Sequence, residues 1–405
     1  MADNKDKKVL NAPHLRFPEF SGEWVETTLG KISEITKGRG ISKDQLSEQG
    51  SPCILYGELY TKYKSEIIDE VYSRTELDSS SLVKSKANDV IIPCSGETAI
   101  DISTARCVPF DNILLGGDLN IIRLKHDDRG FFAYQLNGAR KKDIARVAQG
   151  VSVVHLYGEN LKQIRVYHPN IEEQKKITRL LSLIDERIAT QNKIIEDLKK
   201  LKSAIIEKTF NENYSNKIRL RDVGSYIRGL TYSSDDVVES NGIFVMRSNN
   251  IINGSSLDYH NNIVSVNKQI LTEQQLQTGD IVICMANGSS SLVGKSSFYD
   301  GDCSTPITVG AFCGIYRSKE PIVKWLFQTN KYRRYIWNSL QGGNGAIANL
   351  NGDDILRMSF SIPATPAKDN RIKLLTSVDT LLESNISLCD LYISQKLYLL
   401  RQMFI

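Results

Sequence analysis

The chain has 405 residues, of which 41% are hydrophobic and 24% are charged, a composition typical of a globular protein with two or three domains. The net charge of +4 permits nucleic-acid binding without indicating it, so any basic surface must be local. The polar opening MADNKDKKVL has no apolar core for a signal peptide, and no run reaches the roughly 18 apolar residues of a membrane span. We therefore expect a cytoplasmic protein without membrane contact.

The cysteines and histidines do not form a ligand pattern. The seven cysteines are scattered, odd in number and lack a C-x-x-C pair, which favours buried, reduced thiols over a disulfide or zinc framework. The closest histidines, His155 and His168, have no cysteine or carboxylate at ligand spacing. We therefore predict no metal site.

Residues 1–23 are predicted to form a polar tail and a docking segment. The stretch PHLRFPEF contains two prolines that disfavour helix. Phe17 and Phe20 supply apolar anchors for docking onto another part of the protein.

Residues 24–168 are predicted to form a first globular domain. Short runs rich in Ile and Val are bounded by Gly, Asn, Asp and Ser, a pattern that predicts the β-strands of a mixed domain. Within this domain we expect a helix over 131–139 and a closing strand over 161–168.

Residues 169–210 are predicted to form a long helix. From 172 to 210 there is no Pro or Gly, and apolar residues recur three or four positions apart, as in a coiled-coil seam. At about 1.5 Å per residue this helix would span roughly 55–60 Å. The seam residues are Ile177, Leu181, Ile184, Ile188, Ile195, Leu198 and Ile205.

The same layout then returns. After a linker, 211–217, the segments 218–362 and 363–405 repeat the domain and the helix. We expect a helix over 321–335 and a closing strand over 355–362. The matched positions, 191 to 194 residues apart, are 54–57 with 245–248, 89–92 with 280–283, 122–123 with 316–317, Asp185 with Asp379, Gln191 with Asn385, and Lys202 with Lys396. Matches in the same order indicate an internal duplication.

The short linker constrains the geometry. The second domain must begin near the far end of the first long helix, so the second helix can bury its apolar stripe against the first only by running back antiparallel. The expected fold is α+β: two tandem-repeated mixed α/β domains separated by two long helices that form an antiparallel coiled coil with pseudo-twofold symmetry. The chain's two ends would then lie close together, and Gln191 would face Asn385 in a polar layer that fixes register.

The predicted helix-pair interface comprises Ile184, Ile188, Gln191, Ile195, Leu198, Val378, Leu382, Asn385 and Tyr392. In the alternative arrangement, each long helix packs on its own domain instead.

The sequence contains no convincing catalytic constellation. The segment 288–296 resembles a phosphate loop, but five residues separate its glycines where a P-loop has four. Dinucleotide-binding, G-x-S-x-G and H-E-x-x-H patterns are missing, and so is the D/N-P-P-Y/F tetrapeptide of an amino-methyltransferase. We predict no catalytic residue and no cofactor bound by this chain.

Loops that mix cations, amides, hydroxyls and aromatics occur at related places in both repeats. Arg and Lys bind phosphates, whereas Asn, Gln and Arg can recognise base edges. Ordinary solvated loops have the same composition, and that interpretation stays open. The candidate DNA-binding residues are Lys37, Arg39, Tyr56, Lys62, Lys64, Ser95, Arg106, Lys141, Arg146 and Ser152 in the first repeat, and Arg228, Arg247, Asn249, Asn250, Asn287, Ser289, Lys295, Arg333, Arg334 and Asn344 in the second.

This organisation resembles the specificity (S) subunits of type I restriction–modification systems. The opening PHLRFPEF, followed by Gly22-Glu-Trp24 and Leu29-Gly-Lys-Ile32, is similar to the usual start of that family. IEEQKKI at 171–177, preceded by Pro169, resembles the family's P-x-x-E-Q-x-x-I pattern. The second copy departs from it, because 363–372 lacks the Glu-Gln pair.

The resemblance implies a non-catalytic DNA-recognition subunit. Each domain would be a target recognition domain for one half of a split double-stranded target, with half-sites about one turn, roughly 34 Å, apart. Two methyltransferase (modification) subunits would bring S-adenosylmethionine, and two restriction/translocase subunits would bring ATP and Mg. Because the loops of the two repeats differ, we expect the two half-sites to differ.

Two other functions remain open at this stage. The chain could be a non-enzymatic coiled-coil scaffold built from a duplicated interaction module, which the modest net charge favours. A stand-alone DNA-modifying enzyme would need a cofactor site that the sequence does not show.

Overall fold

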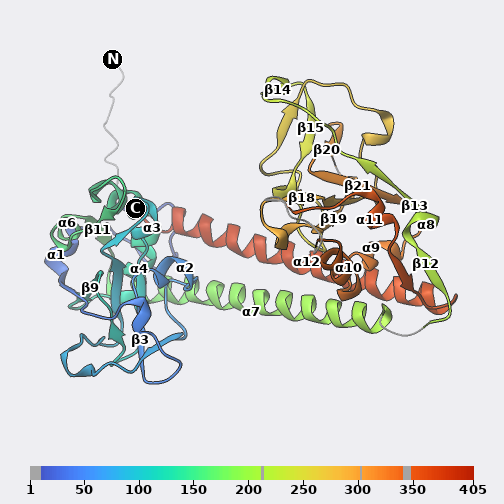
Figure 1. Ribbon diagram of the computed structural model, residues 1–405. Helices are drawn as coiled ribbons and strands as arrows, with labels where there is room; N and C mark the ends of the chain where they lie inside the picture. The colour runs from blue at the N-terminus through green and yellow to red at the C-terminus, as the bar shows by residue number, and fades with distance from the viewer. Residues whose placement is uncertain (1–10, 211–213, 302, 341–347) are drawn as a thin grey trace, which may run out of the picture. The chain divides into compact units, whose positions relative to one another are not determined.

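The computed structural model describes residues 11–210, 214–301, 303–340 and 348–405. It divides into two compact units. Unit 1 contains Met1–Lys193 and Ile386–Ile405, and unit 2 contains Ile194–Asn385 (Figure 1). Each unit therefore holds one predicted domain together with part of each long helix, and each is described separately.

Unit 1 is built on two small sheets. An antiparallel four-stranded sheet has the order β2-β9-β5-β7, and a three-stranded sheet has the order β4-β3-β8, in which β3 and β8 are parallel. Two short antiparallel pairs, β1-β11 and β6-β10, complete the strands. The bounds are β1 Val25–Thr28, β2 Ser33–Lys37, β3 Ser51–Ile54, β4 Ser73–Thr75, β5 Asp89–Pro93, β6 Ser95–Gly96, β7 Arg106–Val108, β8 Leu114–Leu115, β9 Leu119–Leu124, β10 Val154–His155 and β11 Arg165–His168.

Helices surround these sheets. They are α1 Leu29–Ile32, α2 Glu58–Thr61, α3 Ala99–Ile102, α4 Arg129–Asn137, α5 Lys141–Val147 and α6 Gly158–Lys162. Strand β5 is buried along its whole length because it lies between β9 and β7 and is made almost entirely of apolar residues. The core joins β5 and β9 to Phe131 and Phe132 of α4.

Unit 2 repeats this topology with one additional strand, β14, in its second sheet. Its sheets have the orders β13-β21-β17-β19 and β14-β16-β15-β20, with β15 and β20 parallel, and its short pairs are β12-β23 and β18-β22. The strands are β12 Lys217–Arg219, β13 Gly224–Arg228, β14 Val237–Val238, β15 Ile243–Met246, β16 Val264–Val266, β17 Ile281–Cys284, β18 Ala286–Asn287, β19 Ser296–Phe298, β20 Ile307–Val309, β21 Cys313–Ser318, β22 Ala348–Asn349 and β23 Ser359–Ser361. The helices are α8 Leu220–Val223, α9 Val323–Leu326, α10 Asn330–Leu340 and α11 Gly352–Leu356.

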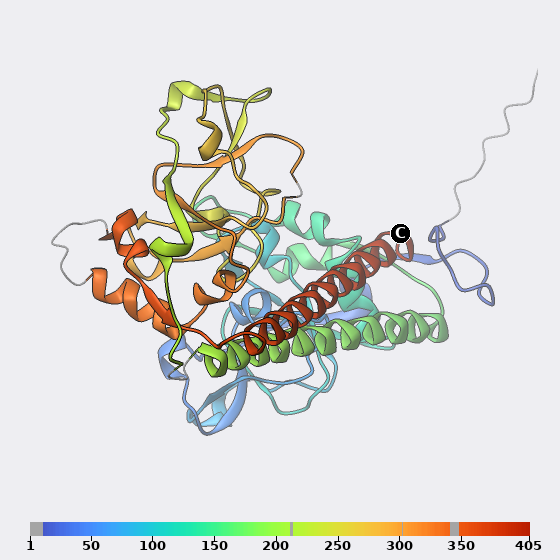
Figure 2. The ribbon, with the colours of Figure 1, turned by 90° about the vertical axis from the view of Figure 1, so that its right-hand side faces the viewer.

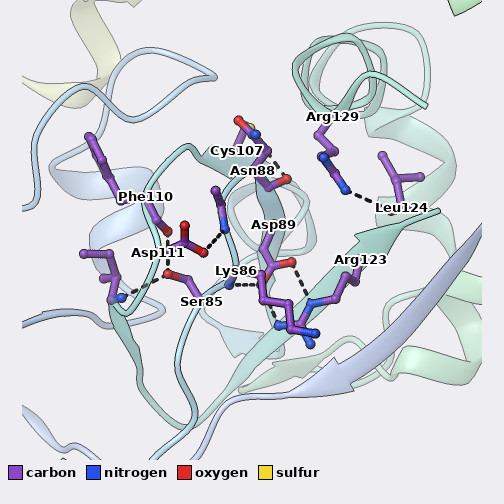
Figure 3. Close-up of polar contacts among 12 residues, drawn as sticks. Ser85, Lys86, Asn88, Asp89, Cys107, Phe110, Asp111, Arg123, Leu124 and Arg129 are labelled. Atoms are coloured by element: carbon purple, nitrogen blue, oxygen red, sulfur yellow. Dashed lines mark hydrogen bonds and ion pairs between the residues drawn. The ribbon is translucent and has the colours of Figure 1, made fainter. Parts of the chain in front are cut away.

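An ion pair between a buried aspartate and a partly exposed arginine occupies the same place in both sheets. In unit 1 the Arg123 guanidinium donates two hydrogen bonds to Asp89, at 2.8 and 2.7 Å, and the Lys86 backbone N–H donates to the same carboxylate at 2.8 Å (Figure 3). In unit 2 Arg317 binds Asp280 at the same two distances. The strand orders of the two units and these matched contacts agree with the duplication predicted from the sequence.

The predicted long helix is confirmed as α7, Ile171–Phe210, and a second long helix, α12, covers Ala367–Gln402. In unit 1 the start of α7 and the end of α12 both pack into the core of the first domain, through residues such as Ile184 and Leu400. In unit 2 the end of α7 and the start of α12 lie side by side against the second domain, with Phe210 and Leu375 in one core cluster (Figure 2).

The segment before β1 docks onto unit 1 through an aromatic residue, as predicted. Phe17 packs against the core of unit 1, and the Lys176 ammonium lies 4.5 Å from the centre of its ring. Arg16 forms an ion pair at 2.7 Å with Glu173, the buried acid at the start of α7. The Leu15 N–H donates to the Gln402 carbonyl at 2.9 Å, so this segment meets the end of α12 as expected.

Three predicted elements need correction. The segment 161–168 is only half strand, because Leu161 belongs to α6, and 355–362 begins in α11 for the same reason. The helix expected over 321–335 is divided into α9 and α10. In each case a short helical turn buries an apolar residue before the chain changes direction, and apolar spacing alone does not reveal such a turn.

Six of the seven cysteines are buried and Cys303 is partly buried, all as free thiols. Burial raises the pKa of Cys107 and of Cys313 to about 12. Among the described residues, no helix combines the length and apolar character needed to cross a bilayer, and no three metal-binding side chains come together.

Candidate nucleic-acid interface

In unit 1, the first cluster of predicted residues lies where the sheet ends at β2 and β6. Lys37 is the last residue of β2, and its ammonium lies 5.9 Å from the centre of the Tyr157 ring. Tyr157 stacks on His155 at a centroid distance of 6.2 Å, and His155 pairs with Ser95 across β10 and β6. A cation and two exposed aromatic rings therefore share one edge of the domain, a combination that suits a nucleic-acid backbone and bases.

The loop after β3 borders the same edge. A Cβ atom on Gly96 would lie 3.5 Å from the Tyr60 hydroxyl, so α2 sits directly beside β6. Burial raises the pKa of Tyr60, and neighbouring Tyr56, Asp101 and Glu97 raise it further. The predicted Tyr56 thus belongs to the same edge as Lys37, but acidic side chains accompany it.

Unit 2 brings together the equivalent loops. The Asn287 amide donates to the Ser248 hydroxyl at 3.4 Å, which joins the loop after β15 to the loop after β18. Arg247 is exposed and its guanidinium donates to the Asn262 carbonyl at 3.4 Å. Predicted Asn249 and Ser289 are exposed on the same two loops. This edge carries amides and hydroxyls where the first domain carries aromatics and acids.

A separate hollow of about 310 Å³ lies between the loop after β18 and α10. Predicted Lys295 and Arg333 line it together with Trp337, a residue that sequence reasoning did not select and that is 62% exposed. Arg334 lies one position further along α10 and is also exposed. Burial lowers the pKa of Lys331, and the nearby Lys217 and Arg334 lower it further, so this part of unit 2 is locally basic.

Three predicted residues lie inside the fold and need correction. Arg106 is buried and donates to the Tyr63 carbonyl at 2.8 Å. Asn250 is buried and donates to the Asp258 and Asn261 carbonyls. Ser95 is buried and donates to Asp118 at 2.9 Å. Because their polar atoms face the protein, we assign all three to the framework and not to a DNA contact.

Several other predicted cations are already partnered. Lys62 binds Glu58 at 2.6 Å, and Arg146 binds Asp143 at 3.0 Å on a different face. Lys141 is partly buried, and both burial and Arg106 lower its pKa. The remaining predicted residues are surface residues of the domains, Arg39, Lys64, Ser152 and Arg228, whereas Asn344 lies outside the described residues.

The predicted helix-pair residues divide between the two units. In unit 1, Ile184 and Gln191 are buried, Ile188 is partly buried, and Tyr392 lies 6.0 Å from the Arg187 guanidinium. In unit 2, the buried residues are Ile195, Val378 and Leu382, and the partly buried ones are Leu198 and Asn385. The facing of Gln191 and Asn385 stays a prediction.

Sequence reasoning overlooked the charges at these helices. In unit 1 the Lys396 ammonium lies 2.6 Å from Asp185 and also contacts Glu66, and the Tyr134 hydroxyl donates to Asp185 at 2.7 Å. In unit 2 Asp379 accepts ion pairs from Lys202 at 2.7 Å and from Lys324 at 2.8 Å. The signal was present, because Asp185 and Asp379, and likewise Lys202 and Lys396, occupy matched positions of the duplication.

Comparison with known proteins identifies part of the chain. Residues 21–200 match the family model of the type I restriction modification DNA specificity domain. This match covers less than half of the chain. The chain is 34% identical over 173 residues to the type I restriction enzyme EcoKI specificity subunit of Escherichia coli (strain K12), and the alignment covers 40% of this chain and 34% of that subunit. The StySPI specificity subunit of Salmonella potsdam matches with the same identity and coverage. The chain thus aligns with about a third of the length of these specificity subunits.

Solved structures extend the likeness of fold to almost the whole chain. The S subunit of a type I restriction–modification system from M. genitalium superposes with a TM-score of 0.61 at 15% identity, covering 97% of this chain and 99% of that one. A structure described as the structural basis of complex assembly and conformational transition of the type I R-M system gives a TM-score of 0.52 at 13% identity, covering 94% and 97%. At these identities the likeness concerns the fold alone.

Proposed function

We propose that this chain is the DNA-recognition subunit of a type I restriction–modification complex. Each domain recognises one half of a bipartite double-stranded target, and the chain itself performs no catalysis. The observation that carries this proposal is one framework built twice with different loop chemistry, in a chain whose residues 21–200 match the model of the type I specificity domain. The framework contacts are shared, as Asp89–Arg123 and Asp280–Arg317 illustrate, whereas the exposed loops are not. That division suits a protein that must recognise two different half-sites.

We further propose that α7 and α12 pair as an antiparallel coiled coil with pseudo-twofold symmetry and set the spacing between half-sites. Support comes from the reciprocal ion pairs: Asp185 of α7 meets Lys396 of α12, and Asp379 of α12 meets Lys202 of α7. A twofold relation between the helices requires this exchange of roles between matched positions. Two independent domains carried on unrelated helices would not require it.

The partners of the complex are part of the same proposal. Two methyltransferase subunits and two restriction/translocase subunits would assemble on the chain in the cytoplasm. S-adenosylmethionine, ATP and Mg would be bound by those subunits. The outer surface of α12 offers exposed apolar residues for such contacts, among them Leu391, Leu397 and Tyr398.

The alternative is a non-enzymatic scaffold without DNA recognition. The modest net charge of +4 favours it, as does the fact that several predicted DNA-binding cations already have acidic partners. The two functions differ in one measurable property, because contacts to phosphates release counterions and make log affinity fall linearly with log salt concentration.

Affinity for the target duplex, measured across a salt series with the complex of this chain and its methyltransferase subunits, separates them. We expect the parent complex to bind sequence-selectively. Removing one phosphate contact, as in Lys37→Gln or Arg247→Gln, should reduce the slope of log affinity against log salt concentration by about 1. Lys200→Gln, at an exposed helix position paired with Glu196, is the control and should leave the slope unchanged. Binding that is weak and independent of sequence would favour the scaffold.

A further inference from the structure

A hollow of about 260 Å³ in the first domain lies beside Lys37 and Tyr157. Its wall includes Ile35 of β2, Asn120 of β9 and Gly158, the first residue of α6. Lys37 and Tyr157 stand at the rim, and Tyr157 is 45% exposed. The hollow therefore opens on the edge of the domain where the predicted DNA-binding residues gather.

Asn120 is fully buried, and its side chain is only half satisfied. Its amide nitrogen donates to the Leu156 carbonyl at 2.9 Å. Because a carbonyl only accepts, this bond fixes the orientation of the amide, and the oxygen Oδ1 must point the other way. Within the described part of the chain Oδ1 has no hydrogen-bond partner. It lies on the hollow's side, 3.5 Å from where a Cβ on Gly158 would stand.

An unpaired buried acceptor lowers the stability of the folded protein by about 1–3 kcal/mol. The matched positions of the second domain show how the same framework avoids this cost. There Tyr226 occupies the position of Ile35, and Gly314 occupies the position of Asn120. Gly352, the first residue of α11, matches Gly158, the first residue of α6. The Tyr226 ring lies across both glycines, since a Cβ on either would come within 2.3 Å of it. The second domain thus fills this place with its own side chain, and the first leaves it open with an acceptor inside.

We propose that this hollow receives the major-groove edge of a nucleobase that carries its amino group there, adenine or cytosine, and that this amino group donates to Asn120 Oδ1. The inference rests on the proposed function and assigns a specificity-determining residue to the half-site of the first domain. Guanine and thymine present the acceptors O6 and O4 in the major groove, and either would face Oδ1 without a proton between them. Lys37 at the rim is placed to hold the neighbouring phosphate.

The test compares variants that close the hollow by different routes. Gly158→Ala places a methyl group 3.5 Å from Oδ1 while leaving the bond from Asn120 to Leu156 in place. The double variant Ile35→Tyr with Asn120→Gly rebuilds the arrangement of the second domain. Each is assembled as the full chain with its methyltransferase subunits, after thermal unfolding has shown that it folds like the parent.

The target motif is mapped first, and affinity is then measured for duplexes in which one base of the first half-site lacks its amino group. We expect the parent complex to lose about tenfold at one position when the amino group is removed. Both variants should bind the duplexes with and without this amino group with equal affinity. Both should keep the full selectivity of the parent at the second half-site.

If the variants retain full preference at every base, or lose affinity equally for all sequences, the inference about Asn120 is wrong while the proposed function stands. A parent complex without any sequence preference would overturn the proposed function and this inference with it.

Discussion

Where the long helices meet the first domain, one lysine, Lys396, pairs with two carboxylates, Asp185 and Glu66. The second holds one carboxylate, Asp379, against two lysines. In both places the helices contribute the same matched pair, an aspartate and a lysine, and the domain supplies the additional charge. The difference teaches that the helices supply the repeated part of this charge cluster, while each domain adds a charge of its own.

The largest expected effect comes from removing the lysine of the first cluster. Lys396→Met leaves Asp185 and Glu66 buried without the ammonium that pairs with both, so we expect a loss of about 3–5 kcal/mol in the stability of unit 1. Hydrogen exchange of α12 from 386 to 402 in the full chain would measure it. Lys200→Met, at an exposed position, is the control, and equal protection in both variants would contradict the account.

The paired arginines of the two sheets should behave alike. Arg123→Met and Arg317→Met each leave a buried aspartate without its two strongest donors, which we expect to cost about 2–3 kcal/mol in either unit. Hydrogen exchange of β5 and β17 provides the measurement. A large loss in one unit and none in the other would show that the two frameworks are not equivalent.

The lysine of the second cluster should matter less than that of the first. Lys202→Met leaves Asp379 paired with Lys324 and leaves the Gly254 carbonyl without its donor at 2.9 Å. We expect a loss of about 1–3 kcal/mol, seen as faster exchange at the start of α12. A loss as large as that from Lys396→Met would remove the distinction between the clusters.

The smallest effect concerns pH. Burial and Glu66 raise the pKa of Asp185 above its ordinary value of 3.8, although Lys396 and Tyr134 oppose the shift. A carboxyl whose pKa is higher in the folded state binds its proton more tightly there, so stability falls as pH rises from 3.8 through the raised pKa. Denaturant titrations across this range should show a shallower fall for Asp185→Asn, and identical profiles would contradict the assignment.

The sequence predicted the parts of this fold that repeat. It mostly did not predict which side chains each copy buries or exposes. Matched strands, the long helices and the docking of Phe17 followed from spacing and order. The burial of Arg106 did not, because a basic residue at the start of a short strand resembles a surface cation until its neighbours in the sheet are known. Asn120 and Tyr157 were missed because one amide and one aromatic carry no signal apart from the hollow between them.

Independent recognition of one half-site by each domain is the central claim. The most direct test replaces 218–362 with the corresponding domain of another specificity subunit, in the full chain co-expressed with its methyltransferase subunits, and maps methylated adenines across the host genome. We predict a split motif in which one half changes and the other half and its spacing stay the same. A motif that changes in both halves, or methylation that is unaffected by the exchange, would contradict it.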